Sequence, residues 1–280
     1  MHSSFEIPNR HGDSIRGDIH LPDDPAGAPV LLICHGFKGF KDWGGFPFAA
    51  DFLATHGFAA VRFNFSLNGI GEQFEEFTLL ENFARNTISR ELEDLRDLID
   101  AMERGEIVPQ PGVRARVGLI GHSLGGGVAI LHAAEDARVR GVVSWAGVAD
   151  FMRWGKKTRA QWRKQGRIEI ENGRTHQMMP MDVTMLEDIE TNRARFDIPQ
   201  AAARIGGPLL VVHGAQDVSV PIEEGHRVAA AADPSRTRFV SIPRADHTFG
   251  IRHPFIGTTS AFTTVLEETV RHFRGVFAQD

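Results

Sequence analysis

The chain has 280 residues, of which 42% are hydrophobic and 24% charged, a composition typical of a folded globular protein and not of a disordered one. Its 31 Lys and Arg against 36 Asp and Glu give a formal net charge of −5, so there is no overall electrostatic reason to bind nucleic acid. No basic segment followed by an apolar stretch opens the chain, and no apolar run approaches the length of a membrane span. The single cysteine, Cys34, lies in the apolar run 30–34, which predicts a buried thiol and a reducing compartment. We expect a cytoplasmic protein of one large domain or two small ones.

Short runs rich in Val, Ile and Phe alternate with amphipathic or alanine-rich stretches along the chain. This alternation is typical of an α/β protein with a parallel sheet. We expect an edge strand at Ile15–Leu21 and further strands at Val30–Cys34, Ala59–Phe65, Arg116–Ile120, Gly141–Trp145, Pro208–His213 and Arg238–Ile242. Helices are predicted between them at Phe46–His56, Thr87–Arg104, Leu124–Asp136, Ile222–Ala232 and Thr258–Val276.

One interval interrupts this alternation, because the stretch between Trp145 and Pro208 is too long for an ordinary crossover connection. We interpret residues 150–206 as an insertion, the lid segment, carried on a core formed by residues 1–149 and 207–280. Residues 167–175 alternate apolar and charged side chains up to Asn172-Gly173, which predicts a hairpin. A helix is expected from Asp182 to Phe196, with Asp182 as its N-cap.

The sequence Gly121-His122-Ser123-Leu124-Gly125 matches the pattern G-x-S-x-G, with a predicted strand before it and a predicted helix after it. A serine on such a tight turn is exposed at the helix N-terminus, where free N–H groups and the positive end of the dipole favour a developing oxyanion. A glycine-rich turn with an incidental serine is the alternative interpretation. We expect Ser123 to be a nucleophile.

A serine hydroxyl needs a base to take its proton and an acid to orient that base. Asp217 follows the strand Pro208–His213, and His247 follows the strand Arg238–Ile242. Both should reach the turn at Ser123, because the carboxyl ends of parallel strands meet at one edge of a sheet. Asp246 and His253 are the nearest competitors, but Asp246 adjoins the histidine and His253 lies several residues beyond the strand end.

The oxyanion of a tetrahedral intermediate requires two donors. Leu124 supplies one backbone N–H at the start of the helix, and Phe37, in the loop His35-Gly36-Phe37 directly after the strand Val30–Cys34, is the candidate for the other. His35 and His122 flank this machinery, and we interpret both as packed or hydrogen-bonded structural residues rather than second bases.

With His35-Gly36-Phe37, Gly121-His122-Ser123-Leu124-Gly125, Asp217 and His247 in this order, the chain resembles the α/β-hydrolase superfamily over nearly its whole length. The resemblance implies the α/β-hydrolase fold, with a mostly parallel central sheet flanked by helices, and acyl-transfer chemistry. Within the superfamily the chain is most similar to the feruloyl and cinnamoyl esterases and related carboxylesterases. Members resembling prolyl oligopeptidases use a tyrosine in the oxyanion hole, and this sequence has none.

The composition of the lid segment leaves its role open. It contains five methionines and two tryptophans, namely Met152, Met178, Met179, Met181, Met185, Trp154 and Trp162. These side chains either line a pocket for an apolar or aromatic acyl group or form the segment's own core. Residues 153–174 hold eight Lys or Arg against two Glu. That excess indicates either a solvated face or a surface that attracts an anionic substrate.

The expected function is that of a serine carboxylesterase, which acts through an acyl-enzyme on a small or medium, apolar or aromatic acyl ester. A peptidase, amidase or thioesterase would use the same residues, and a non-catalytic binding protein on the same fold is the alternative from another class. No metal-ligand spacing or phosphate-binding loop is present, so we expect neither metal nor cofactor. We expect the chain to bind a small-molecule ester and neither nucleic acid nor a membrane. The sequence leaves open whether the chain forms a homodimer.

Overall fold

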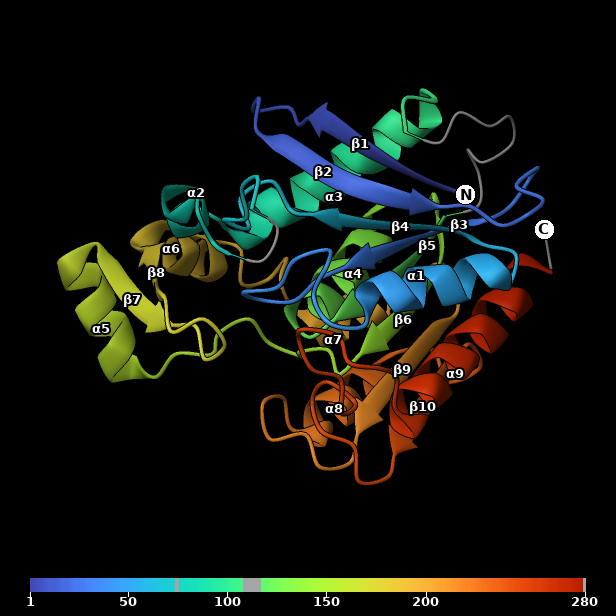
Figure 1. Ribbon diagram of the computed structural model, residues 1–280. Helices are drawn as coiled ribbons and strands as arrows, with labels where there is room; N and C mark the ends of the chain where they lie inside the picture. Colours follow the sequence, from blue (N-terminus) through green and yellow to red (C-terminus); the bar gives the residue numbers. More distant parts are fainter. Residues whose placement is uncertain (74–75, 108–116, 279–280) are drawn as a thin grey trace.

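Eight strands form the central sheet in a computed structural model that describes residues 1–73, 76–107 and 117–278 (Figure 1). Their spatial order is β1 (His2–Pro8), β2 (Ser14–His20), β4 (Ala59–Asn64), β3 (Val30–Cys34), β5 (Val117–His122), β6 (Val139–Trp145), β9 (Leu209–Gly214) and β10 (Thr237–Ile242). The pairs β1–β2 and β2–β4 are antiparallel, and all the other pairs are parallel. The carboxyl ends of the six strands from β4 to β10 therefore lie along one edge of the sheet.

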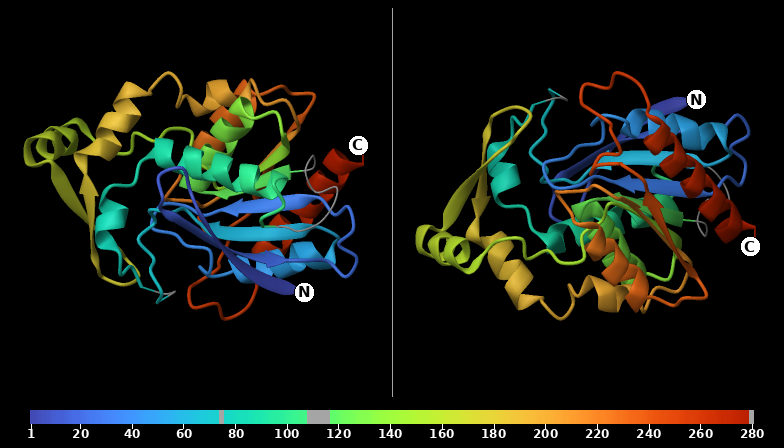
Figure 2. Two further views of the ribbon diagram at one scale, coloured as in Figure 1. Left: turned by 90° about the horizontal axis from the view of Figure 1, so that it is seen from above. Right: turned by 90° about the horizontal axis from the view of Figure 1, so that it is seen from below.

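Helices cover both faces of this sheet, because its central strands are apolar on both sides. In β3, Leu31 and Ile33 pack with α1 (Phe46–Thr55) and α9 (Ser260–Phe277), whereas Leu32 and Cys34 pack with α3 (Ile88–Glu103) and α4 (Leu124–Glu135). The helix α8 (Ile222–Ala231) lies on the same face as α4 (Figure 2). Within the part of the chain that the structure describes, no helix is both long and apolar enough to span a bilayer.

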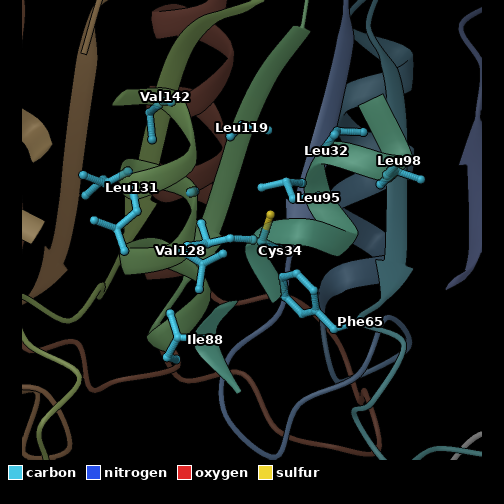
Figure 3. Packing of buried hydrophobic residues seen from close by; sticks show 14 of the residues in the cluster. Leu32, Cys34, Phe65, Ile88, Leu95, Leu98, Leu119, Val128, Leu131 and Val142 are labelled. Carbon is cyan, nitrogen blue, oxygen red and sulfur yellow. The ribbon is translucent and has the colours of Figure 1, made fainter. Parts of the chain in front are cut away.

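The thiol of Cys34 is fully buried among side chains of α3, α4 and the neighbouring strands (Figure 3). Leu95 and Val128 lie next to it in this cluster, and Phe65 lies close by. Burial raises the pKa of the Cys34 thiol far above its usual value, and the carboxyl of Glu91 acts in the same direction. The structure confirms the predicted burial of the Cys34 thiol.

The predicted α/β-hydrolase fold is confirmed, with one error in the sheet. The strand predicted at Ile15–Leu21 is β2, but it is not an edge strand, because β1 pairs along its outer side. Most side chains of β1 are exposed, so its sequence lacks the apolar run by which the other strands are recognised. The strand predicted from Arg116 is β5, and Arg116 itself lies outside the described residues.

The lid segment contains α5 (Lys156–Gln165), β7 (Arg167–Glu171), β8 (Met178–Asp182), α6 (Val183–Thr191) and α7 (Ile198–Ala202). In Figure 1, α5 and β7 project from the sheet, whereas β8 contacts α2 (Leu80–Ala84). The predicted hairpin is present as β7 paired antiparallel with β8. Its loop spans residues 172–177 and is not a two-residue turn, since Asn172 N–H bonds to Gln177 O at 2.8 Å.

The helix predicted at Asp182–Phe196 is shorter than expected. α6 ends at Thr191, because the amide of Asn192 donates hydrogen bonds to the backbone oxygen (3.1 Å) and the side chain (2.8 Å) of Asp188. Asp182 occupies the N-cap position but makes no capping hydrogen bond. Its carboxylate accepts instead from Arg167 Nε at 2.6 Å, which joins the start of α6 to the hairpin.

Candidate active site

Ser123 lies on the turn that joins β5 to α4 and has a strained backbone, with φ 58° and ψ −120°. The glycines of the motif allow this turn: a Cβ at Gly121 would lie 2.2 Å from Gly125 O, and a Cβ at Gly125 would lie 2.4 Å from His35 O. The turn is held by hydrogen bonds from Ser123 N–H to Trp145 O (2.9 Å) and from Gly126 N–H to Ser123 O (3.0 Å). The predicted strand, turn and helix therefore all occur in the sequence order expected for a nucleophile elbow.

Asp217 and His247 are brought together from the loops after β9 and β10. His247 Nδ1 is 2.8 Å from Asp217 Oδ2, so the ring donates a hydrogen bond to the carboxylate and presents its other nitrogen as a proton acceptor. The Asp217 side chain is fully buried, while that of His247 is 19% exposed. His247 and Ser123 line the same cavity of about 290 Å³, which also contacts Phe37 and Leu124.

The Asp217 carboxylate has a complete set of hydrogen-bond donors. Oδ1 accepts from the backbone N–H groups of Ser219 and Val220, each at 2.9 Å. Oδ2 lies 3.3 Å from His213 Nε2, in addition to its bond to His247. Burial alone would raise the pKa of Asp217, but the hydrogen bonds from His213, His247 and Val220 together hold it well below its usual value. Asp217 is therefore a stable anion beside the imidazole.

The loop after β3 runs directly beside the serine. A Cβ at Gly36 would lie 2.9 Å from Ser123 Cβ, and Gly39 N–H closes a turn on Gly36 O at 2.9 Å. Lys38, at φ 55° in that turn, reaches the lid segment, where its ammonium donates to Glu171 O at 2.9 Å. The Phe37 N–H and the first N–H of α4, that of Leu124, belong to segments on either side of Ser123, as an oxyanion hole requires.

The two flanking histidines are held in structural hydrogen bonds. His35 Nδ1 donates to Gly36 O at 2.9 Å, and its Nε2 accepts from Phe65 N–H at 3.2 Å. His122 Nε2 donates to His247 O at 3.0 Å. Burial lowers the pKa of His35 to about 4; burial, together with the repulsion that a protonated His247 would exert, lowers that of His122 to about 3. Both rings are neutral at pH 7 and position the loops that carry Phe37 and His247.

Asp246 and His253, the two competitors for the roles of acid and base, form hydrogen bonds elsewhere. Asp246 Oδ1 accepts from Thr248 N–H (3.1 Å) and Gly250 N–H (2.8 Å), so this carboxylate stabilises its own turn. His253 Nδ1 accepts from Gly44 N–H at 2.9 Å, and its ring packs on Phe40. His247 is hydrogen-bonded to Asp217 and lines the cavity at Ser123, whereas neither Asp246 nor His253 lines that cavity.

No sequence pattern indicates a role for His213, whose fully buried ring bridges Val220 O (2.8 Å) and Asp217 Oδ2. It lies within the apolar strand β9, where a single histidine has no spacing signal.

A second histidine cluster consists of His2, His20 and Asp51, whose ligand atoms lie within 4.8 Å of one another. Arg62 Nε donates to His20 Nε2 at 3.0 Å, which leaves the proton on Nδ1 and directs it to Asp51. The cluster is therefore satisfied by its own hydrogen bonds without a metal.

The methionines and tryptophans of the lid segment divide between the two predicted roles. Met185 and Trp154 line the cavity at Ser123, whereas Met179, Met181 and Trp162 are buried in the segment's own packing. Four of the eight Lys and Arg in residues 153–174 are paired with acids: Arg153 with Glu224, Arg159 and Arg163 with Glu190, and Arg167 with Glu81 and Asp182. One of these residues, Arg153, also lines the cavity at Ser123.

The chain matches the alpha/beta hydrolase family over residues 30–256 and belongs to that family. A relative from Escherichia coli, described as an uncharacterized 31.7 kDa protein in the traX-finO intergenic region, is 32% identical over 132 residues, which is 47% of this chain and 42% of the relative. The chain spans less than half the length of the curated relatives it matches.

Solved structures resemble the chain over its whole length. The esterase domain of a Rhodothermus marinus protein has a TM-score of 0.68 at 22% identity, with 98% of both chains covered. Est1E from Butyrivibrio proteoclasticus, solved with ferulic acid bound, has a TM-score of 0.71 at 18% identity, with 99% of this chain and 100% of that chain covered. At these identities the likeness establishes the α/β-hydrolase fold.

Proposed function

We propose that the protein is a serine carboxylesterase. The observation that carries this proposal is the hydrogen bond of 2.8 Å between His247 Nδ1 and Asp217 Oδ2, in a cavity that both His247 and Ser123 line. A buried anionic carboxylate fixes the imidazole with its Nε2 available as a base, which is the arrangement that activates a serine hydroxyl. The esterase domain and Est1E, as neighbours of the same fold, are in line with this reaction class.

In the proposed reaction, Ser123 Oγ attacks the ester carbonyl while His247 takes the hydroxyl proton. The backbone N–H groups of Phe37 and Leu124 stabilise the oxyanion, and His247 returns the proton to the leaving alcohol. Water, activated by the same imidazole, then hydrolyses the acyl-enzyme and restores the free serine. Asp217 keeps its negative charge throughout and stabilises the imidazolium that forms in each half of the cycle.

The walls of the cavity indicate the acyl group. Core residues contribute Ile88 and Val148, and the lid segment contributes Phe151, Trp154, Met185 and Ile189. A mostly apolar cavity of about 290 Å³ lies at the small end of ligand sites and suits a short or medium aliphatic acyl chain or a single aromatic ring. We propose that residues 150–206 form a lid that completes this acyl pocket.

Steady-state kinetics with p-nitrophenyl esters of increasing chain length, a methyl hydroxycinnamate, a matched thioester and a matched anilide test the proposal. We expect ester hydrolysis that falls by several powers of ten in Ser123→Ala, because the three residues act as a unit. Ser260→Ala, at an exposed position at the start of α9, is the matched control and should retain full activity. Full activity in Ser123→Ala would contradict the mechanism, and faster turnover of the thioester or anilide would contradict the substrate class.

A further inference from the structure

The loop that carries the proposed oxyanion donor Phe37 contains a tight turn with an unfavourable residue. Gly39 N–H bonds to Gly36 O at 2.9 Å, so Phe37 and Lys38 are the two central residues of this turn. Lys38 has φ 55°, a left-handed conformation that favours glycine or asparagine at this position of a turn. A lysine here carries a conformational cost, which the contacts of its side chain offset.

The ammonium group of Lys38 joins this turn to the hairpin of the lid segment. Lys38 Nζ donates to the backbone oxygen of Glu171, the last residue of β7, at 2.9 Å, and it lies 5.7 Å from the centre of the Phe37 ring. The side chain is half-buried, and burial lowers the pKa of Lys38, while the Glu171 carboxylate acts in the opposite direction. A partly desolvated ammonium group forms a stronger hydrogen bond with a carbonyl oxygen than one in water.

The two segments joined by Lys38 form parts of the same cavity wall. Phe37, the neighbour of Lys38 in the chain, lines the cavity at Ser123 from the core. Ile170, the neighbour of Glu171 in β7, lines it from the lid segment. The hydrogen bond from Lys38 to Glu171 O therefore restrains the position of Ile170 relative to Phe37.

Two further contacts hold the hairpin. The guanidinium group of Arg174 lies 5.3 Å from the centre of the ring of Phe40, a buried residue of the same loop as Lys38. Gln177 donates to Phe77 O at 3.1 Å and accepts from Phe77 N–H at 3.4 Å. Because these contacts do not involve Lys38, loss of its ammonium group should loosen the hairpin without unfolding it.

We propose that Lys38 is a positioning residue that fixes Ile170 beside the proposed oxyanion hole and thereby favours esters with longer acyl chains. This inference rests on the proposed function, because it concerns the substrate of the same cavity. A long acyl chain gains contact with a wall that is already ordered, so that binding does not have to order the hairpin. An acetyl group, with a single methyl group beyond the carbonyl, depends least on this wall.

Steady-state kinetics of Lys38→Met with p-nitrophenyl acetate and p-nitrophenyl hexanoate test this role, since the substitution keeps a long apolar stem and removes the ammonium group. We expect KM for the hexanoate to rise about fivefold with kcat near that of the wild type, the effect of one hydrogen bond that orders the binding site. KM for the acetate should change by less than about twofold. An equal rise for both esters, or no rise for either, would overturn the proposal.

Three further variants test how Lys38 acts. Lys38→Arg retains a charged donor and should recover most of the preference for the hexanoate. Lys164→Met, at an exposed position of α5, makes the same change elsewhere in the lid segment and should behave as the wild type. In an Ile170→Ala background, Lys38→Met should no longer alter the ratio of the two KM values; additive effects of the two substitutions would show that Lys38 does not act through Ile170.

Amide hydrogen exchange of residues 168–171 gives a readout that does not depend on activity. These amides should exchange faster in Lys38→Met than in the wild type and Lys164→Met, because the hairpin has lost one tie to the core. Unchanged exchange would overturn the proposal. A wild type that hydrolyses no ester would contradict the proposed function, whereas an active wild type whose ratio of KM values is the same in Lys38→Met would contradict this inference alone.

Discussion

His213 is the residue whose role is least visible in the sequence and most specific in the structure. Its fully buried ring lies 3.3 Å from Asp217 Oδ2 and 2.8 Å from Val220 O, so its Nε2–H holds the acid and the loop after β9 at once. Asp217 therefore shares its negative charge with a second imidazole in addition to His247. We assign His213 as a positioning residue for the proposed triad.

Replacement of His213 by Phe keeps a flat aromatic ring, somewhat larger than imidazole, and removes the donor. We expect kcat to fall by about tenfold, the effect of losing one hydrogen bond to a charged group. The acidic limb of the pH–rate profile should move to higher pH, because an Asp217 with one donor fewer stabilises positive charge on the neighbouring imidazole more strongly.

His213→Asn, which can still donate to the carboxylate, should recover part of kcat and of the profile. A His213→Phe variant with lower thermal stability but an unchanged pH–rate profile would show that the residue only packs the core.

At the scale of elements, the lid segment and the core share the cavity at Ser123. Ile170 of β7 and Met185 and Ile189 of α6 face it from the lid segment, while Ile88 of α3 faces it from the core. Lys38 ties the loop of Phe37 to this segment through Glu171 O. In the proposed reaction, the size of these lining side chains sets the length of the acyl group.

Truncation of Met185 to Ala should lengthen the acyl pocket. Met185 is buried and lines the cavity, so we expect the preferred p-nitrophenyl ester to shift to a longer acyl chain, with a loss of stability of about 2–4 kcal/mol from the cavity that is created. The measurement is kcat/KM across the ester series, beside urea unfolding.

Met178→Ala changes a methionine of the same segment that is 48% exposed, and it should leave the chain-length preference unaltered. An unchanged preference in Met185→Ala would show that the acyl group does not reach α6.

The elements that the sequence predicts well are those whose pattern has one local cause. The side chains of the runs 30–34 and 59–65 contact the two apolar helix layers in turn, and this pattern identifies their strands. Gly121, Ser123 and Gly125 identify the turn, because only glycine permits its close backbone contacts. Asp217 and His247 could be placed because strand ends meet at one edge of a parallel sheet. No local pattern encodes the remaining features. The strand β1 depends on its pairing with β2, and the end of α6 and the contact of His213 with Asp217 each depend on single side-chain hydrogen bonds.

At the scale of the whole molecule, two carboxyl groups of α3 are buried where the helix meets the sheet. Glu91 accepts from Asn86 Nδ2 at 2.8 Å, and Asp94 accepts from Asn9 Nδ2 at 2.7 Å. Burial raises the pKa of Glu91 to about 8 and that of Asp94 to about 6. Both groups hold a proton in the folded protein at pH values where the unfolded chain has released it.

The free energy of unfolding should therefore fall as the pH rises from about 4.5 to about 8, by a few kcal/mol for Glu91. Glu91→Gln keeps the shape of the protonated group, so the variant should gain stability relative to the wild type as the pH rises from 5 to about 8. Urea unfolding at several pH values measures this slope. Glu187→Gln, at an exposed position of α6, is the matched control and should leave the slope of the unfolding free energy with pH unaltered. An equal slope in Glu91→Gln and the wild type would show that Glu91 does not cause the pH dependence.

Intact-mass analysis after reaction with a fluorophosphonate, an ester-like reagent that marks activated serines, tests whether His247 and Asp217 activate Ser123. We expect one adduct per chain in the wild type, no adduct in Ser123→Ala, and slow labelling in His247→Gln. A folded wild-type protein that remains unlabelled, or a Ser123→Ala variant that labels as fast as the wild type, would contradict this activation.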